Sequence, residues 1–333
     1  MSQVGAGSLT SYCEVARFVG LDPNAMLRRA RINPQILDHP EHPLDVTQVV
    51  RLLEDSARES GCHCFGLLMA ESRSLSRIGP LRLLVNHLDT AHDVVAAVVR
   101  YQSLITEAMA ISLEEEDGTA IIRTDLVAER VGPQAIELLM GVVYRIISET
   151  VSGHWHPDSA HFVHSAPGEL GVHRKVFQAQ LVFDNAFNGF ACSTESLDVL
   201  NPTADPVLAL HAKRYLDLLM REASDGSIME RAKRSIHLLL PSGRANLDLV
   251  GENLGLHPRT LQRLLGREKL SFGMLLNEVR RELALRYLSG STHSVSSIAQ
   301  MTGYATPSSF TRWFCTEFGT APAAWRAEER HLH

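Results

Sequence analysis

The chain has 333 residues, 45% of them hydrophobic and 21% charged, a composition typical of a folded globular protein with room for two domains. No apolar run reaches the roughly 18 to 20 residues that span a bilayer, and the N-terminus lacks the basic and apolar regions of a secretory signal. Five scattered cysteines do not form a disulfide framework, so we expect a cytoplasmic protein with no membrane association.

The net charge of −6 is distributed unevenly along the chain. Residues 243–333 contain ten Arg and one Lys against one Asp and seven Glu, a net charge of +3, which leaves −9 for the rest. A basic segment attached to an acidic body is expected where only that segment meets the phosphates of a nucleic acid. Nucleic acid is therefore a candidate partner of the C-terminal third alone.

Helical patterns dominate the first hundred residues. Residues 46–60 predict an amphipathic helix with Asp45 as N-cap and Gly61 at its end. Its apolar face comprises Val46, Val49, Val50, Leu53 and Ala57. Residues 89–105 predict a second helix, with Asp89 or Thr90 as its N-cap.

The pattern then changes to short strands around one further helix. Two β-type runs in residues 108–127 flank Asp117-Gly118, a strong hairpin signal. Residues 136–153 are apolar nearly all round and predict a buried helix. Short strands are expected in 160–166 and 180–193, the last pair turning near Asn185–Asn188. The fold class predicted for this region is α+β, with leading helices and a small, mainly antiparallel sheet.

A change of composition near residue 225 divides the chain. A helix begins around Asp205-Pro206, and residues 223–227 read as a linker. Beyond the linker nothing resembles a strand, and the turn signals are Pro241-Ser242-Gly243, Gly255, Ser289-Gly290 and Gly303. The sequence thus predicts an α+β domain over residues 1–222 and an all-α domain over residues 228–333.

The all-α domain contains an internal repeat. LDLVGENLGLHPRTLQRLL, which begins at Leu247, aligns with VSSIAQMTGYATPSSFTRWF, which begins at Val295. The aligned pairs are Val250 and Ile298, Gly251 and Ala299, Gly255 and Gly303, and Leu256 and Tyr304 at an offset of 48, then Leu261 and Phe310, and Leu265 and Phe314 at an offset of 49. The two copies predict helix-turn-helix units over about residues 247–266 and 295–318.

Each copy meets the physical requirements of a helix-turn-helix. A small residue lets two helices cross closely, a glycine takes the left-handed turn, and apolar residues pack the second helix back. The exposed face of the second helix carries Arg259, Gln262 and Arg263 in the first copy and Ser308, Ser309 and Arg312 in the second. These side chains can read bases, since Arg suits guanine, Gln suits adenine and hydroxyls suit either base or phosphate. Arg263 and Arg312 can equally be phosphate clamps or solvated surface residues.

Residues 230–330 resemble the AraC/XylS family of transcription regulators. The positions that match its motif are Ile298, Ala299, Gly303, Tyr304, Ser309, Phe310, Arg312, Phe314, Phe318, Gly319, Pro322 and Arg326. The resemblance implies a seven-helix domain that inserts two recognition helices into successive major grooves of double-stranded promoter DNA and recruits RNA polymerase. Trp313 and Trp325 depart from the commoner aromatic types, and Cys315 stands where a basic residue is frequent.

Residues 15–210 are similar to the sensor domain of one branch of that family, the branch related to the ornithine-utilisation regulator. The matching stretches include FGLLMAES, IGPLRLLVNHLDTAHDVVAAVVRY and LDVLNPTADPVL. This resemblance implies a domain that binds a small-molecule effector and self-associates as a homodimer, without naming the effector. The leading helices distinguish it from a jelly-roll sensor.

Two stretches contain residue types that bind metal ions, and they suggest an alternative to regulation by a metabolite. GHWHPDSAHFVHSAPGELGVH holds five histidines in residues 154–173, and Cys62-His63-Cys64 is a second candidate. His161 and His164 differ by three, so on a strand they would face opposite sides. The alternative hypothesis is a metal- or redox-responsive regulator that uses Cys62, Cys64 or the histidine cluster.

No catalytic motif is present. The chain has no G-x-S-x-G elbow, Walker loop or G-x-G-x-x-G motif, so we expect no enzyme activity, no catalytic residues, no cofactor and no metal. The sequence therefore predicts a DNA-binding transcription regulator, and specifically an activator that responds to a small metabolite.

Overall fold

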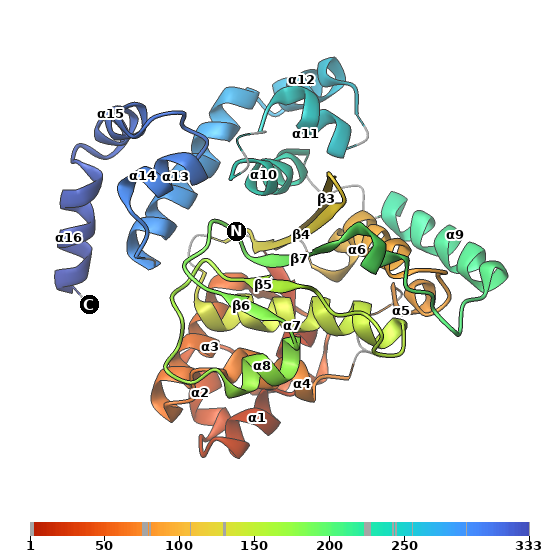
Figure 1. The fold of residues 1–333 in the computed structure, drawn as a ribbon. Coiled ribbons are helices and arrows are strands. Elements are labelled where there is room, and N and C mark those ends of the chain that lie inside the picture. Colours follow the sequence, from red (N-terminus) through yellow and green to blue (C-terminus); the bar gives the residue numbers. More distant parts are fainter. Residues whose placement is uncertain are drawn as a thin grey trace. The chain divides into compact units, whose positions relative to one another are not determined.

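The computed structural model describes residues 3–74, 79, 81–106, 108–128, 131–222, 228–241, 243, 245–254, 256–290 and 292–332 (Figure 1). The expected linker over 223–227 and the turn residues Ser242 and Gly255 lie outside this range. The chain divides into two compact units. The first contains Met1–His161, Ala166–Val182 and Asn188–Ser224, and the second contains Phe162–Ser165, Phe183–Phe187 and Asp225–His333.

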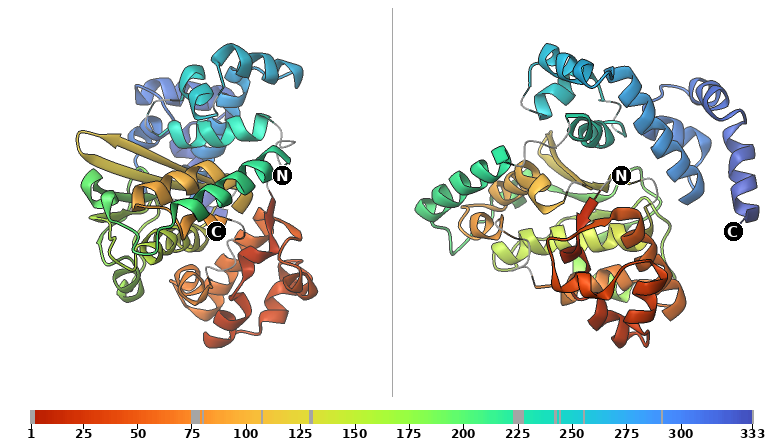
Figure 2. Two further views of the ribbon diagram at one scale, coloured as in Figure 1. Left: turned by 90° about the vertical axis from the view of Figure 1, so that its right-hand side faces the viewer. Right: turned by 180° about the vertical axis from the view of Figure 1, so that it is seen from behind.

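The first unit begins with a group of short helices. The elements are β1 (Gln3–Gly5), η1 (Ala6–Leu9), α1 (Tyr12–Phe18), α2 (Pro23–Arg29), η2 (Pro34–Asp38), β2 (Pro43–Asp45), α3 (Val46–Ser60) and α4 (Phe65–Ser72), with β1 antiparallel to β2. Figure 2 shows α1 to α4 gathered on one side of the unit.

The predicted amphipathic helix is α3, and its local signals act as expected. The Asp45 side chain accepts a hydrogen bond from the Thr47 amide at 2.7 Å, and Gly61 ends the helix with φ of 67°. All five residues of the predicted apolar face are buried, and so are Leu52 and Ser56. The burial of this polar residue is tolerated locally, because the Ser56 hydroxyl donates to the Leu52 carbonyl at 2.7 Å.

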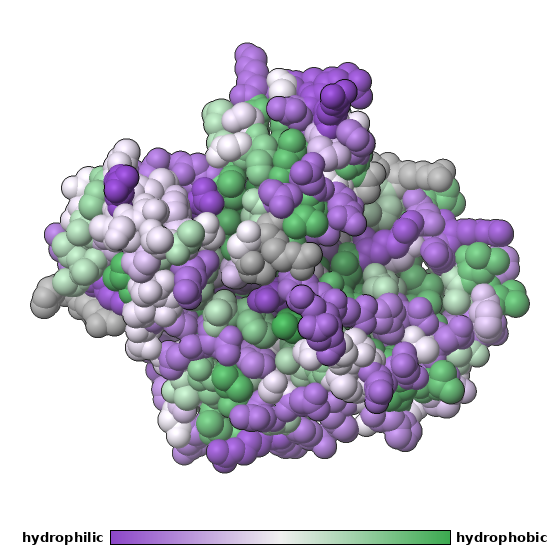
Figure 3. All heavy atoms as spheres, turned by 45° about the horizontal axis from the view of Figure 1, so that its top comes forward, coloured by the Kyte–Doolittle hydropathy of each residue, from purple (hydrophilic) through white to green (hydrophobic). Residues whose placement is uncertain are grey.

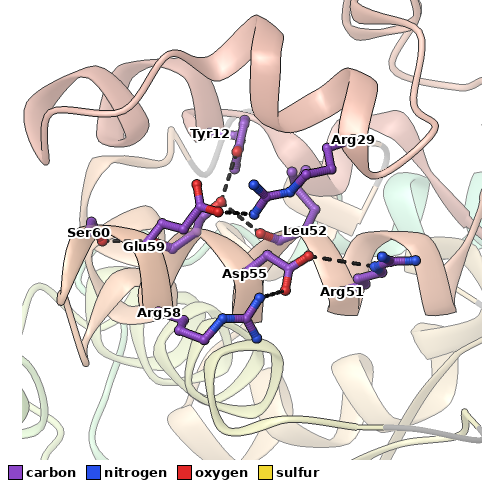
Figure 4. A network of polar contacts seen from close by, with 9 residues as sticks. Tyr12, Arg29, Arg51, Leu52, Asp55, Arg58, Glu59 and Ser60 are labelled. Carbon is purple, nitrogen blue, oxygen red and sulfur yellow. Dashed lines mark hydrogen bonds and ion pairs between the residues drawn. The ribbon is translucent and has the colours of Figure 1, made fainter.

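Polar contacts tie α1 and α2 to α3 (Figure 4). The Tyr12 hydroxyl lies 2.9 Å from that of Ser56 in the buried interior, and burial raises the pKa of Tyr12 to about 12. Arg29 of α2 forms an ion pair with Glu59 of α3 at the surface. Solvent screens this exposed pair and leaves it little net effect on stability, so apolar burial holds these helices together.

The rest of the first unit is a sheet with covering helices. The elements are α5 (Leu81–Val85), α6 (Ala91–Ile105), β3 (Met109–Glu116), β4 (Thr119–Leu126), α7 (Pro133–Thr150), β5 (Ser159–His161), α8 (Gly171–Phe177), β6 (Gln180–Val182), β7 (Gly189–Ser193), η4 (Thr194–Asp198) and α9 (Pro206–Glu222). The predicted hairpin is β3–β4, whose turn residues Asp117 and Gly118 have φ of 49° and 78°.

The pairing of the last two strands differs from expectation. The sheet order is β3-β4-β7-β5-β6, so β5 lies between β6 and β7, and β6 is parallel to β5. Residues 180–193 therefore do not form a hairpin of neighbouring strands. The buried helix was predicted correctly: α7 is buried along most of its length and, in Figure 1, lies between the sheet and the group containing α3 and α4.

The C-terminal segment of the second unit is helical in the part that the structure describes, whereas its two short segments, 162–165 and 183–187, contain no helix. Residues 228–332 contain seven helices, as the family resemblance implies: α10 (Ile228–Leu239), α11 (Leu247–Asn253), α12 (Pro258–Arg267), α13 (Phe272–Gly290), α14 (Val295–Met301), α15 (Pro307–Phe318) and α16 (Pro322–Leu332). Their shared core includes Ile236, Leu261, Leu283, Ile298 and Phe314, all fully buried. In neither unit is any described helix long and apolar enough to cross a membrane.

Candidate nucleic-acid interface

The first helices of the two helix-turn-helix units begin with equivalent N-caps. The Asn246 side chain accepts a hydrogen bond from the Leu249 amide at 2.9 Å before α11. The Ser294 side chain accepts one from the Ser297 amide at 3.0 Å before α14. Donor and acceptor are each 48 residues apart in the two copies, so the repeat extends to the capping chemistry.

The recognition helices α12 and α15 begin in an equivalent way. The His257 ring nitrogen Nδ1 accepts from the Arg259 amide at 3.3 Å, and the Thr306 hydroxyl accepts from the Ser309 amide at 3.2 Å. A proline follows each cap at the first helical position, where its missing N–H leaves no helical bond unmade. The start of each recognition helix is therefore fixed relative to the turn before it.

The turn between the helices is closed by one repeated backbone bond. The Leu256 amide donates to the Gly251 carbonyl at 2.8 Å, and the Tyr304 amide donates to the Ala299 carbonyl at the same distance. A Cβ at Gly251 would lie 2.8 Å from the Leu256 carbonyl oxygen, which explains the need for a small residue there. Gly303 has φ of 74°, which confirms the predicted left-handed turn in the second helix-turn-helix.

The recognition helices are anchored by their inner faces. Leu261 and Leu265 of α12 and their counterparts Phe310 and Phe314 of α15 are all fully buried. Trp313 adds a polar anchor, because its indole N–H donates to the Asn277 side chain on α13 at 2.7 Å. This indole also packs 5.4 Å from the Tyr304 ring. Such anchoring holds the opposite face of each helix in a fixed orientation.

The outer faces carry the residues predicted to contact DNA, and all six are exposed. They are Arg259, Gln262 and Arg263 on α12 and Ser308, Ser309 and Arg312 on α15. At the offset of 49, Arg263 coincides with Arg312 and Arg259 with Ser308. Neither the Arg263 nor the Arg312 guanidinium has a hydrogen bond or ion pair within the described residues. The Ser309 hydroxyl lies 2.9 Å from that of Thr306, so part of its hydrogen-bonding capacity serves the cap.

Other charged residues nearby have structural partners. The Arg280 side chain donates to the Thr302 carbonyl at 3.2 Å, and its guanidinium lies 4.7 Å from the centre of the Tyr304 ring. The Glu317 carboxylate accepts from the side-chain amide of Asn277 at 3.1 Å. These contacts hold α13 against the second helix-turn-helix. Arg280 and Glu317 therefore have structural roles, unlike the charged residues on the outer faces.

Two further residues on the same outer faces were not among those predicted from the sequence. Arg267 and Thr316 are exposed, lie at equivalent positions, and follow Arg263 and Arg312 by four residues. The helical repeat was the signal that could have identified them, since residues i and i+4 share a face.

The clustered histidines each have their own partner. His154 donates to the Val151 carbonyl at 2.8 Å, and His173 donates to the buried Glu137 carboxylate at 2.9 Å. The other three contacts are His156 with the Tyr144 hydroxyl at 2.9 Å, His161 with the Ser159 hydroxyl at 2.8 Å and His164 with the Ser165 carbonyl at 3.1 Å. β5 ends at His161, so His164 lies beyond the strand on which the sequence placed both.

Cys62 and Cys64 lie close together between α3 and α4. Their sulfur atoms are 3.8 Å apart, and the hydrogen bond from the Cys64 thiol lowers the pKa of Cys62 to about 6. Among the residues described by the structure, no group of three or more His, Cys, Asp or Glu is arranged to hold a metal ion.

Comparison with known families agrees with this architecture. Residues 20–200 match the family described as the arabinose-binding domain of AraC transcription regulator, N-terminal, and residues 250–328 match a helix-turn-helix domain. The chain belongs to the AraC family. As an AraC-family protein it is a DNA-binding transcription regulator with an N-terminal effector-binding domain, and this is not a family of enzymes.

The AraC-family relatives include proteins of similar length. The HTH-type transcriptional regulator VirS of Mycobacterium tuberculosis is 28% identical over 98% of this chain and 97% of its own. The ornithine utilization regulator of Pseudomonas aeruginosa is 22% identical over 92% of this chain and 91% of its own. Among solved structures, the transcriptional regulator CdpR of Pseudomonas aeruginosa matches with 19% identity and a TM-score of 0.42, covering 91% of this chain and 96% of its own.

Proposed function

We propose that this AraC-family regulator is an activator controlled by a small metabolite. In this proposal, residues 228–333 bind a promoter site, with α12 and α15 in successive major grooves, and the bound protein recruits RNA polymerase. The base-contacting residues are Arg259, Gln262, Arg263, Ser308, Ser309 and Arg312. Residues 1–222 bind the metabolite and form a homodimer, and residues 223–227 connect the two domains.

The observation that carries this proposal is the repeated recognition face. Two helices with equivalent caps and buried anchors present equivalent arginines, Arg263 and Arg312, whose guanidinium groups have no protein partner among the described residues. An unpaired guanidinium held on a rigid helix is suited to bidentate contact with guanine or to contact with a phosphate.

The control by metabolite follows a population shift. The effector favours one arrangement of the paired sensor domains, and that arrangement sets the spacing of two DNA-binding domains on the promoter. Because a ligand shifts an equilibrium only by its differential affinity, effector and DNA must each bind more tightly in the presence of the other.

One apolar surface supports the homodimer. Five of the nine large hydrophobic side chains that are exposed in the described part of the chain lie on α9. They are Val207, Leu208, Leu210, Tyr215 and Leu218, and their spacing places them on one side of that helix. Hydrophobic residues reach the surface at the right-hand edge of Figure 3, the side on which α9 lies in Figure 1. A self-complementary apolar face is the expected feature of a twofold dimer.

The DNA-binding experiment uses the full-length chain on the region upstream of its own gene and on scrambled DNA of equal length. Arg263→Ala and Arg312→Ala should each weaken specific binding by about 1 to 3 kcal/mol if the side chain reads a base. The control is Arg51→Ala, because Arg51 is exposed on α3 in the first unit and its removal changes the net charge equally.

The same titrations at about 50 and about 200 mM salt separate the two kinds of contact. A base reader, when removed, lowers affinity for the specific site and leaves the scrambled DNA nearly unaffected. Equal weakening on both DNAs, with a shallower salt dependence, would make these arginines phosphate contacts and refute the base-reading assignment.

A redox response is the second candidate function. It is favoured by the 3.8 Å separation of the Cys62 and Cys64 sulfur atoms and by the lowered pKa of Cys62. Oxidation of this pair would have to change DNA affinity, which loss of the effect in a Cys62→Ser, Cys64→Ser protein would establish.

A further inference from the structure

The N-terminal unit contains a cavity of about 250 Å3. It is bordered by residues of β1, η1, α3, α6, β3, β4 and α7, all within this unit. Its wall is predominantly apolar, and α3 and α7 supply Val49, Val50, Val142 and Val143, each buried. A mostly apolar cavity with a few polar groups is the usual form of a small-molecule site.

A few polar residues also line the cavity. Ser8, Arg73 and Thr106 line it, and Arg73 donates a hydrogen bond to the carbonyl of Gly7, the neighbour of Ser8. The Ser8 hydroxyl is buried and has no hydrogen-bond partner in the described part of the protein. A buried hydroxyl without a partner is destabilising, and a bound molecule can supply the missing hydrogen bond.

The charges in the wall disfavour an ionic ligand. Among the lining residues that the structure describes, the charged side chains are the partly buried Arg73 and the exposed Glu41, of opposite sign, so these two together favour neither an anion nor a cation. The surrounding apolar wall makes desolvation of an ion costly, whereas a neutral hydrogen-bonding group needs only one partner. The cavity therefore fits a neutral molecule better than an acid or an amine.

We propose that this cavity is the effector site, and that the effector is an uncharged molecule with a hydrocarbon body and one hydroxyl, carbonyl or amide group hydrogen-bonded to Ser8. The role as effector site rests on the proposed function, but the binding itself does not. Occupancy changes the packing among α3, α6, α7, β3 and β4, which gives the ligand a route to alter the conformation of the sensor domain.

The test uses three probes of equal chain length and different charge: 1-octanol, octanoate and octylamine. Thermal unfolding of the full-length protein without DNA should show a rise in Tm that grows with the concentration of 1-octanol and is smaller with the two ions. Val50→Phe, which places a ring in the cavity, should abolish the shift, and Ser8→Ala should reduce it to less than about half.

A matched control exists for the serine. The Ser112 hydroxyl on β3 is also buried without a partner among the described residues, but it does not line the cavity. Ser112→Ala should keep the full shift. If Val50→Phe does not fold, the comparison of Ser8→Ala with Ser112→Ala still decides the site.

If 1-octanol does not change Tm, or changes it equally in the Ser8→Ala and wild-type proteins, the assignment of this cavity as the binding site is wrong. Equal shifts with octanoate or octylamine overturn the neutral class of ligand. The proposed function fails separately, because it requires the unmodified chain to bind its upstream DNA specifically whatever 1-octanol does to Tm. With both intact, 1-octanol should change DNA affinity in the wild type and not in Val50→Phe.

Discussion

At the scale of the residue, Glu54 is a carboxylate in an unfavourable position. It lies beside the start of α7, accepting a hydrogen bond from the Gln134 amide at 2.8 Å, yet burial raises its pKa from 4.5 to about 7. An acid with a raised pKa in the folded state holds its proton there after the unfolded chain has lost it. Its contribution to stability is therefore complete below about pH 4.5 and declines as the pH rises towards 7.

Glu54→Gln should remove that decline. The Gln side-chain oxygen still accepts from the Gln134 amide, and no charge has to be buried. We expect the variant to exceed the wild type by about 1 to 3 kcal/mol in free energy of unfolding at about pH 8, with little difference at about pH 4. Urea denaturation at both pH values measures this, with Glu14→Gln on the exposed side of α1 as control. A Glu54→Gln protein that is less stable than wild type at about pH 8 would contradict the assignment.

Cys62 is the second residue whose chemistry departs from the ordinary. With a pKa of about 6 it is mostly thiolate at neutral pH, so iodoacetamide should alkylate it at a rate that levels off above about pH 7. Cys64→Ala removes the hydrogen bond that lowers this pKa and should shift the profile of Cys62 upward in pH. Peptide mapping by mass spectrometry follows each cysteine separately. An unchanged profile in Cys64→Ala would show that Cys64 is not the cause.

The sequence predicted residue roles best where one element decides them. The Asp45 cap, the apolar face of α3 and the exposure of the six recognition residues each depend on helical periodicity and local capping. Roles that depend on distant partners were not predictable. Examples are Arg280, which braces the turn at Thr302, and His173, which pairs with Glu137 in the interior.

At the scale of the element, local features were again predictable from the sequence, and pairings between distant segments were not. The β3–β4 hairpin was predicted because its two strands are joined by a two-residue turn that specifies their register. The position of β5 between β6 and β7 was not, since parallel pairing joins strands separated by a helix and leaves no short turn motif. The helix-turn-helix units were predictable because each is a local motif and the chain contains it twice.

The turn of the second helix-turn-helix gives a prediction at this scale. Gly303 and Gly319 have nearly the same left-handed backbone, with φ of 74° and 73°, so alanine costs about 1 to 2 kcal/mol of conformational strain at either. Only at Gly303 would the added Cβ also meet a neighbour, the Leu240 side chain at 2.9 Å. Gly303→Ala should therefore destabilise the protein more than Gly319→Ala, by roughly 1 kcal/mol or more in urea denaturation.

The double variant Gly303→Ala, Leu240→Ala separates strain from crowding. In the Leu240→Ala background the neighbouring side chain is absent, so Gly303→Ala should cost about the same as Gly319→Ala does in the wild type. If the extra cost at Gly303 persists without the Leu240 side chain, crowding is not its cause, and the backbone of this turn is less tolerant than that at Gly319.

At the scale of the whole molecule, the uneven distribution of charge along the sequence corresponds to the different functions of the two domains. The helix-turn-helix segment carries a net charge of +3 and the remainder −9, so attraction to DNA is confined to the part that carries the recognition helices. The modest value of +3 means that phosphate attraction alone is weak, and specific contacts from more than one chain would raise affinity through effective concentration.

Dimerisation through α9 is the prediction that tests this requirement. Val207 and Leu218 are 64% and 56% exposed and lie on the same side of the helix, three turns apart. Replacing both with Glu should convert the protein from dimer to monomer in sedimentation experiments, because two copies of the face would then place like charges together. Phe18→Glu is the control, since Phe18 is 81% exposed on α1 and distant from α9 in sequence. Far-UV circular dichroism should be unchanged in both variants. DNA affinity should fall in the α9 variant alone, and a wild-type protein that sediments as a monomer at every concentration would refute the interface.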